Sequence, residues 1–241
     1  MQRKPLTERF KPLFNPLIVA LDVDSDTQAL HLAEELQEFA GAFKIGPRLA
    51  LRYGQSFCQK IAAYAPLFLD CKFFDIPSTM EAAVQASFYS GASLVTVHAL
   101  SGAEALSRLA VLEKKLNEQR PFRILCVTIL TSWDGKSFPV NFKIQSVAQH
   151  VQELASLVKS AGLTGLVCSA EELDLLSNQG LYLVTPGIRL DTDDKNEQKR
   201  TRSPYEALKA GASGLVVGRP IVLAKDPRAA AMEIALSMVA K

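Results

Sequence analysis

The sequence has few cysteines, and their spacing indicates neither a metal site nor a disulfide framework. Its 241 residues include four cysteines (Cys58, Cys71, Cys126 and Cys168), none of them in a CxxC pair. Three of the four lie in or beside apolar runs, where a buried free thiol is the usual state. We therefore expect a reducing, cytosolic environment and no bound metal.

Long apolar runs are also absent. No stretch approaches the roughly 18 continuous apolar residues that a membrane-spanning helix requires. Residues 1–14 are polar and lack the apolar region of a secretory signal. Lysine and arginine number 27 against 25 acidic residues, and the short basic cluster at 199–202 is not the footprint of a nucleic-acid site. We expect a soluble, cytoplasmic protein that binds neither membranes nor nucleic acids.

What the chain does contain is a regular alternation of apolar runs and amphipathic segments. The runs are nearly continuous in apolar residues, which indicates strands that are covered on both faces. Eight of them are predicted strands: Leu17–Leu21, Ala42–Ile45, Leu67–Cys71, Leu94–His98, Arg123–Ile129, Gly165–Cys168, Leu181–Thr185 and Gly214–Val217.

The amphipathic segments predict helices between these strands. The first carries apolar residues at helical spacing behind a Ser-Asp cap, and several of the others end at a glycine. Helices are predicted over Thr27–Phe39, Met80–Ser90, Val147–Ala161 and Tyr205–Ala210.

This alternation predicts a single-domain (β/α)8 TIM barrel. Eight units use residues 1–241, with 1–15 as an N-terminal extension and no room for a second domain. The turn after the first predicted strand, residues 22–26, contains no glycine. A dinucleotide-binding open sheet would carry glycines there, so the barrel is the better interpretation.

Charged residues lie where the first three predicted strands end, and in this fold active sites lie at the carboxyl ends of the strands. Asp22 follows the first run, Lys44 lies in the second, and Asp70 and Lys72 end the third. Charges in such apolar runs are costly unless paired. Residues two apart on a regular strand face the same side, so Asp70 and Lys72 are expected to pair. His98, a lone histidine at a strand end, is assigned no catalytic role.

Residues after the seventh and eighth predicted strands indicate a phosphate-binding end. Gly187 lets the backbone approach a ligand closely, and Arg189 follows it. Gly218 opens space for backbone N–H donors, and Arg219 can bind two phosphate oxygens at once. Together these residues predict a phosphorylated substrate.

The motif DxKxxDIPxT at residues 70–79 resembles the signature of the orotidine 5′-monophosphate decarboxylase family. The similarity extends over most of the chain. Further matching segments are Ala20–Asp22, Phe43–Gly46, Leu130–Ser132, Thr185–Arg189, Gln198 and Val217–Pro220. Two loops depart from the family pattern, at 133–136 and 190–198, although Gln198 keeps the expected distance from Arg189.

The resemblance implies decarboxylation of orotidine 5′-monophosphate to UMP, the last step of de novo pyrimidine nucleotide synthesis, without a metal or other cofactor. It implies that Lys72 donates the proton to C6 and that Asp70 lies beside the substrate carboxylate. Lys44 would hold both in a charge network and, with Asp22, contact the ribose. It also implies a homodimer in which Asp75 and Thr79 reach into the partner's site.

The same resemblance implies the remaining substrate contacts. Thr131 and Ser132 would meet the pyrimidine. The phosphate and the loop that closes over it would be held by Arg189, Gln198, Gly218 and Arg219.

Two alternatives are open at this point. Metal-dependent sugar-phosphate decarboxylases and aldolases of the same superfamily share the Asp-x-Lys-x-x-Asp motif. They carry a carboxylate where this chain has Lys44, and a cation cannot ligate Mg²⁺. The second alternative is a catalytically silent barrel that binds a nucleotide, which the intact set of matched residues disfavours.

Overall fold

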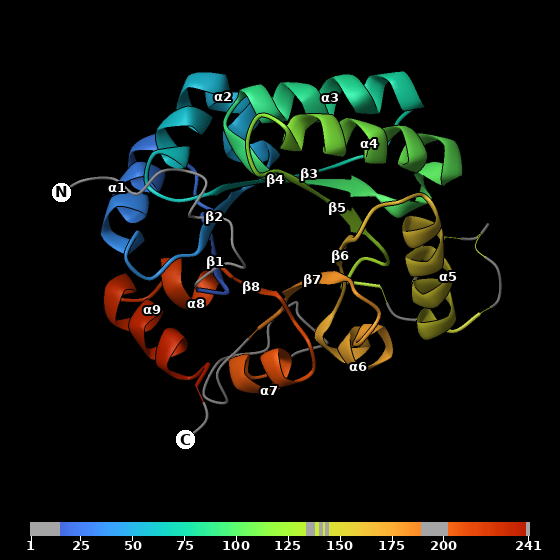
Figure 1. Ribbon diagram of the computed structural model, residues 1–241. Coiled ribbons are helices and arrows are strands. Elements are labelled where there is room, and N and C mark those ends of the chain that lie inside the picture. Colours follow the sequence, from blue (N-terminus) through green and yellow to red (C-terminus); the bar gives the residue numbers. More distant parts are fainter. Residues whose placement is uncertain (1–14, 134–137, 140–141, 143–144, 189–201, 240–241) are drawn as a thin grey trace.

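The computed structural model describes residues 15–133, 138–139, 142, 145–188 and 202–239. In this part of the chain, eight parallel strands form a closed barrel in sequence order, with β1 paired to both β2 and β8 (Figure 1). The strands are β1 (Leu17–Ala20), β2 (Ala42–Ile45), β3 (Leu67–Phe73), β4 (Ala92–His98), β5 (Arg123–Val127), β6 (Gly165–Val167), β7 (Tyr182–Pro186) and β8 (Gly214–Val217). The prediction of a (β/α)8 barrel is therefore confirmed.

Helices surround the barrel on its outer side (Figure 1). They are α1 (Asp26–Leu36), α2 (Pro47–Ala62), α3 (Pro77–Tyr89), α4 (Gly102–Asn117), α5 (Val147–Ser160), α6 (Leu173–Leu176), α7 (Pro204–Lys209), α8 (Arg219–Val222) and α9 (Pro227–Leu236), with short 3₁₀ helices at Ala99–Ser101 and Ala170–Glu172. Within the described residues, no helix combines the length and the apolar character needed to cross a bilayer.

The apolar runs form strands because both of their faces are buried. Side chains that point into the barrel form one cluster: Ile18, Ala20, Ala42, Phe68, Leu94, Leu125, Val184 and Val216. Alternate residues of the same strands point outward and join a larger core shared with the helices. This double burial explains why the strands read as continuous apolar runs and not as alternating patterns.

Local sequence signals set the helix boundaries. The Ser25 side chain accepts a hydrogen bond from the Gln28 N–H at the start of α1, as an N-cap residue does. Gly91, Gly162 and Gly211 follow α3, α5 and α7 with φ of 94°, 93° and 103°. These left-handed conformations favour glycine, so the predicted glycine helix stops are confirmed.

Strand β3 is irregular where it approaches the carboxyl end of the barrel. Leu69 pairs with Val95, but the next pairing joins Phe73 to Val97, so β3 advances four residues while β4 advances two. Lys72 lies in this bulge with a φ of 49°. The expectation of a regular strand is wrong at this point, and the bulge shapes the site described next.

Candidate functional site

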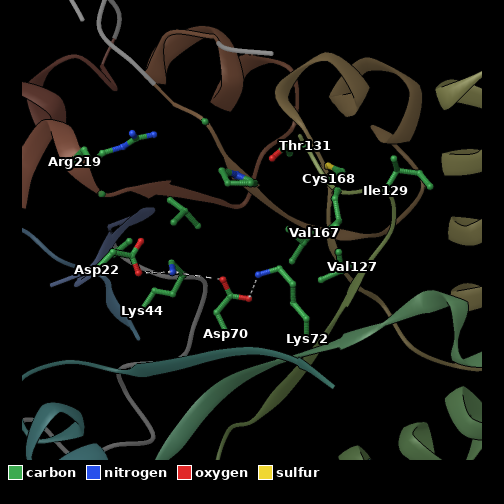
Figure 2. A pocket seen from close by; sticks show the side chains of 16 residues that line it. Asp22, Lys44, Asp70, Lys72, Val127, Ile129, Thr131, Val167, Cys168 and Arg219 are labelled. Carbon is green, nitrogen blue, oxygen red and sulfur yellow. Dashed lines mark hydrogen bonds and ion pairs between the residues drawn. The ribbon is translucent and has the colours of Figure 1, made fainter. Parts of the chain in front are cut away.

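A cavity of about 250 Å³ opens at the carboxyl ends of the strands. It is lined by Ala20, Asp22, Lys44, Asp70, Lys72, Val127, Ile129, Leu130, Thr131, Val167, Cys168, Pro186, Gly187, Val216, Gly218 and Arg219. One wall carries charged groups from β2, β3 and the end of β1, and another is formed by apolar side chains (Figure 2). This is the end of the barrel where the fold places active sites.

Four side chains of alternating charge form a continuous row along the charged wall (Figure 2). Lys44 Nζ lies 3.2 Å from Asp22 Oδ1 and 3.5 Å from Asp70 Oδ2. Lys72 Nζ lies 2.8 Å from Asp70 Oδ1. The structure thus brings together the four charged residues that the sequence placed at three neighbouring strand ends.

Exposure differs along this row. The side chains of Lys44 and Asp70 are 11% and 14% exposed, whereas those of Lys72 and Asp22 are 40% and 54% exposed. The inner pair is therefore nearly desolvated. Lys72 Nζ contacts one carboxylate oxygen of Asp70, and the rest of its surroundings remain accessible from the cavity.

Asp70 is held in its charged form. Burial by itself raises the pKa of a carboxyl group, but the ammonium groups of Lys44 and Lys72 and the hydrogen bonds from Lys72 and Thr96 outweigh it. The net effect is a pKa of Asp70 below its usual range. A negative charge therefore persists at this point of the cavity wall at neutral pH.

Thr96, which the sequence analysis did not single out, contacts both Asp70 and Lys72. Its side chain on β4 is fully buried and donates a hydrogen bond of 2.9 Å to Asp70 Oδ1. The same hydroxyl accepts a hydrogen bond of 2.8 Å from the Lys72 backbone N–H. A signal was present, because Thr96 is two residues after Leu94, which points into the barrel, and strand side chains alternate.

The apolar wall comes from β5, β6 and the residues that follow them. Val127, Ile129 and Val167 line the cavity, together with Thr131. Ser132, predicted to accompany Thr131, is exposed and is not among the described lining residues. An apolar wall facing a charged one suits a flat, partly polar ligand.

The predicted phosphate end is only partly described. Gly218 and Arg219 line the cavity, with Arg219 on the side away from Lys72 (Figure 2). A Cβ on Gly218 would lie 3.7 Å from the Asp22 carboxylate, so glycine keeps this edge of the cavity open. Arg189 and Gln198 lie outside the described residues.

Asp75 and Thr79 do not line the cavity of their own chain. Both are exposed, Asp75 just before α3 and Thr79 in its first turn. Asp75 accepts a hydrogen bond of 2.7 Å from the Ile76 backbone N–H. The neighbouring side chains Phe74 and Ile76 are 62% and 64% exposed, so two large apolar groups flank Asp75 at the surface.

Two further groups near the site act as structural residues. His98 Nδ1 accepts a hydrogen bond from the Leu100 backbone N–H, and burial together with Lys72 lowers the pKa of His98. The imidazole is therefore neutral at pH 7. Burial raises the pKa of the Cys168 thiol to about 12, which excludes a thiolate nucleophile.

Among the described residues, no cluster of three or more His, Cys, Asp or Glu could hold a metal ion.

Comparison with known proteins identifies the family. The profile of the orotidine 5′-phosphate decarboxylase / HUMPS family matches residues 15–234. The chain belongs to this family. Members that resemble it include proteins named orotidine 5′-phosphate decarboxylase from Coxiella burnetii and Pseudoalteromonas atlantica. The first is 39% identical over 88% of this chain and 91% of its own, and the second is 36% identical over 92% and 97%.

A solved structure of the family has the same architecture. The crystal structure of orotidine 5′-phosphate decarboxylase from Lactobacillus acidophilus superposes with a TM-score of 0.81 and is 31% identical. The match covers 94% of this chain and 100% of the other. An uncharacterized conserved protein from Geobacillus kaustophilus matches with a TM-score of 0.77 at 25% identity. The resemblance noted in the 70–79 motif is therefore confirmed at the level of the family.

Proposed function

We propose that this protein decarboxylates orotidine 5′-monophosphate to UMP and CO₂, without a metal or organic cofactor. Membership of the family and the names of the curated relatives support this activity, the last step of de novo pyrimidine nucleotide synthesis. The observation that carries the proposal is the row Asp22, Lys44, Asp70 and Lys72, which presents a fixed ammonium group to the cavity.

Lys72 is the proton donor in this proposal. Loss of CO₂ from C6 of the pyrimidine leaves an electron pair on that carbon, and no cofactor accepts it. An ammonium group held beside the carbon stabilises the developing charge and then transfers a proton to it. The contact of 2.8 Å with Asp70 fixes the Lys72 side chain, while its 40% exposure leaves Nζ accessible from the cavity.

Asp70 contributes in two ways. Its negative charge keeps the Lys72 ammonium group in place, and its lowered pKa supports an ionised state at neutral pH. A substrate carboxylate bound next to it would be repelled, and departure of CO₂ would relieve that repulsion. Lys44 limits the cost of this buried charge by its contact of 3.5 Å with Asp70.

The opposite end of the cavity would bind the phosphate. Arg219 can bind two phosphate oxygens, and Gly218 leaves the adjacent backbone accessible. The family pattern adds Arg189 and Gln198 to this group. Binding energy from a phosphate far from the reacting carbon can be used to orient the pyrimidine against Lys72.

We further propose that the protein acts as a homodimer in which Asp75 and Thr79 complete the partner's site. Both residues lie outside the described cavity lining of their own chain. The exposed side chains of Phe74 and Ile76 on either side of Asp75 favour burial against a second copy. Two-fold dimers bring the same patch of both chains together, as this arrangement requires.

The metal-dependent alternative is disfavoured by Lys44. Its ammonium group lies within 3.5 Å of both Asp22 and Asp70, at the point where a divalent cation would need carboxylate ligands. EDTA should therefore leave the activity unchanged, and loss of activity that Mg²⁺ restores would support the sugar-phosphate branch of the superfamily.

The deciding experiment measures the loss of orotidylate absorbance with purified protein. We expect turnover by the wild type and none by a folded Lys72→Ala variant. Lys60→Ala, which removes an exposed lysine of α2, is the matched control and should retain full activity. A wild type without turnover would support the silent nucleotide-binding barrel, and appreciable turnover by Lys72→Ala would exclude its role as proton donor.

Subunit mixing tests the shared site. A mixed dimer of Lys72→Ala and Asp75→Ala chains has one site with both mutations and one with neither. Random exchange should therefore restore about one quarter of the wild-type activity from two inactive parents. If mass spectrometry shows that subunits exchange and activity is still not restored, Asp75 acts in the site of its own chain.

A further inference from the structure

The backbone of Lys72 has a conformation that needs support from outside its own strand. In the described part of the chain, Lys72 and Asn178 are the non-glycine residues with positive φ, at 49° and 60°. Lys72 lies in the β3 bulge, where the pairing with β4 is interrupted between Leu69 and Phe73. Backbone strain of this kind persists only where surrounding groups hold it in place.

The Thr96 hydroxyl supplies that support. It accepts the Lys72 backbone N–H at 2.8 Å, which replaces the hydrogen bond that regular pairing with β4 would provide. It also donates to Asp70 Oδ1 at 2.9 Å, the same oxygen that lies 2.8 Å from Lys72 Nζ. One buried hydroxyl thus holds the backbone of Lys72 and the carboxylate that orients its side chain.

We propose that Thr96 is a positioning residue, whose buried hydroxyl holds Lys72 and Asp70 in the geometry required for proton transfer. This inference rests on the proposed decarboxylase function. Thr96 is not among the residues that line the cavity, so it acts through its two neighbours and not on the substrate. Its removal should therefore slow the chemical step and leave nucleotide binding nearly intact.

Thr96→Val tests the proposal because valine keeps the shape and removes both hydrogen bonds. We expect kcat to fall about 10- to 100-fold, equivalent to about 1.4–2.7 kcal/mol at 1.36 kcal/mol per decade, with KM changed less than about threefold. Thr96→Ser keeps the hydroxyl and should recover kcat to within about threefold of the wild type.

Thr128→Val is the matched control. Thr128 is also a fully buried threonine, and its hydroxyl donates to the Val167 carbonyl at 3.1 Å. It is not among the described lining residues of the cavity. Its replacement should lower stability without lowering the kcat of the folded protein, so an equal loss of kcat in both valine variants would overturn the positioning role.

Other outcomes are equally decisive. A folded Thr96→Val variant with kcat within threefold of the wild type, or one that changes KM alone, would overturn the proposal. If Thr96→Val does not fold, Thr96→Cys provides a buried but weak hydrogen-bonding group, and it should give a kcat clearly below that of Thr96→Ser. A kcat equal to that of Thr96→Ser would count against the proposal.

Failure of the proposed function would be seen separately, because the wild type itself would not turn over orotidylate. The positioning role can then be read from a crystal structure of Thr96→Val. We expect the Lys72 φ to leave the left-handed region or its Nζ to move away from Asp70. An unchanged φ and an unchanged contact would overturn the role of Thr96.

Discussion

Replacing Lys44 with methionine removes the ammonium group that lies between Asp22 and Asp70. Methionine retains much of the length and volume of lysine, so the change is mainly one of charge. The Asp70 side chain is only 14% exposed, and water cannot fully replace the lost contact. We therefore expect the Lys44→Met substitution to lower the free energy of unfolding substantially.

The magnitude follows from the contacts. Two unit charges 3.5 Å apart, the distance from Lys44 Nζ to Asp70 Oδ2, attract by about 4.7 kcal/mol at an effective dielectric constant of about 20. The Asp22 side chain is 54% exposed, so its pair with Lys44 contributes about 1 kcal/mol or less. Asp70 keeps Lys72 and Thr96 as partners. The expected loss is about 2–4 kcal/mol, somewhat less than for breaking a fully buried pair, because Asp70 keeps these two partners.

Urea unfolding at pH 7 and a fixed protomer concentration measures this loss. The same substitution in an Asp70→Asn background should cost about 1 kcal/mol, because the buried charge it compensates is gone. Arg48→Met breaks the exposed pair with Asp24, at 3.0 Å, and should cost less than about 1 kcal/mol. An equal cost of Lys44→Met in both backgrounds would refute the pairing with Asp70 as its cause.

Three other predictions concern the remaining charged groups. Arg219→Ala should raise KM for the nucleotide about 10- to 100-fold with little change in kcat, and an unchanged KM in steady-state kinetics would contradict a phosphate contact. Because burial lowers the pKa of His98, the unfolded chain takes up a proton first as the pH falls through about 6.5, and stability decreases from that pH down to the folded pKa. Thermal unfolding between pH 5 and 7 should therefore show a shallower slope for His98→Gln, and equal slopes would argue against a neutral buried imidazole. Lys44→Glu would group three carboxylates with Asp22 and Asp70, so Mg²⁺ should raise the melting temperature of this variant and not that of the wild type.

The strands and the charged row could be predicted because each depends on local pattern and on barrel geometry. Continuous apolar runs indicate strands buried on both faces, and parallel strands in a barrel bring their carboxyl ends together. The sequence therefore predicts that Asp22, Lys44 and Asp70 lie at one end of the barrel, although it gives no distances between them. Lys44 carried further information, since its charge disfavours a metal at that point.

The bulge in β3 and the contacts of Thr96 could not be predicted in this way, although strand alternation places Thr96 on the same face as Leu94. Thr96 lies in the run Leu94–His98, where a β-branched residue is typical of any strand. Its hydroxyl acquires a function only through the register that places it beside Asp70 and Lys72. The register between strands depends on tertiary packing and cannot be read from one strand. The left-handed φ of Lys72 could not be predicted either, since lysine rarely adopts this conformation and nothing in the sequence indicates it.

The contacts that form the site therefore depend on the register of the barrel strands. Asp70 receives hydrogen bonds or ion pairs from Lys44 on β2, Lys72 on β3 and Thr96 on β4. A slip of β4 by one residue would turn the Thr96 hydroxyl toward the helices and leave Asp70 and the Lys72 N–H without this partner inside the barrel. Buried charges cost stability when they lose their partners, so the charge of Asp70 penalises such a slip. The contacts that arrange Lys72 and Asp70 at the cavity therefore also favour the native register of β4.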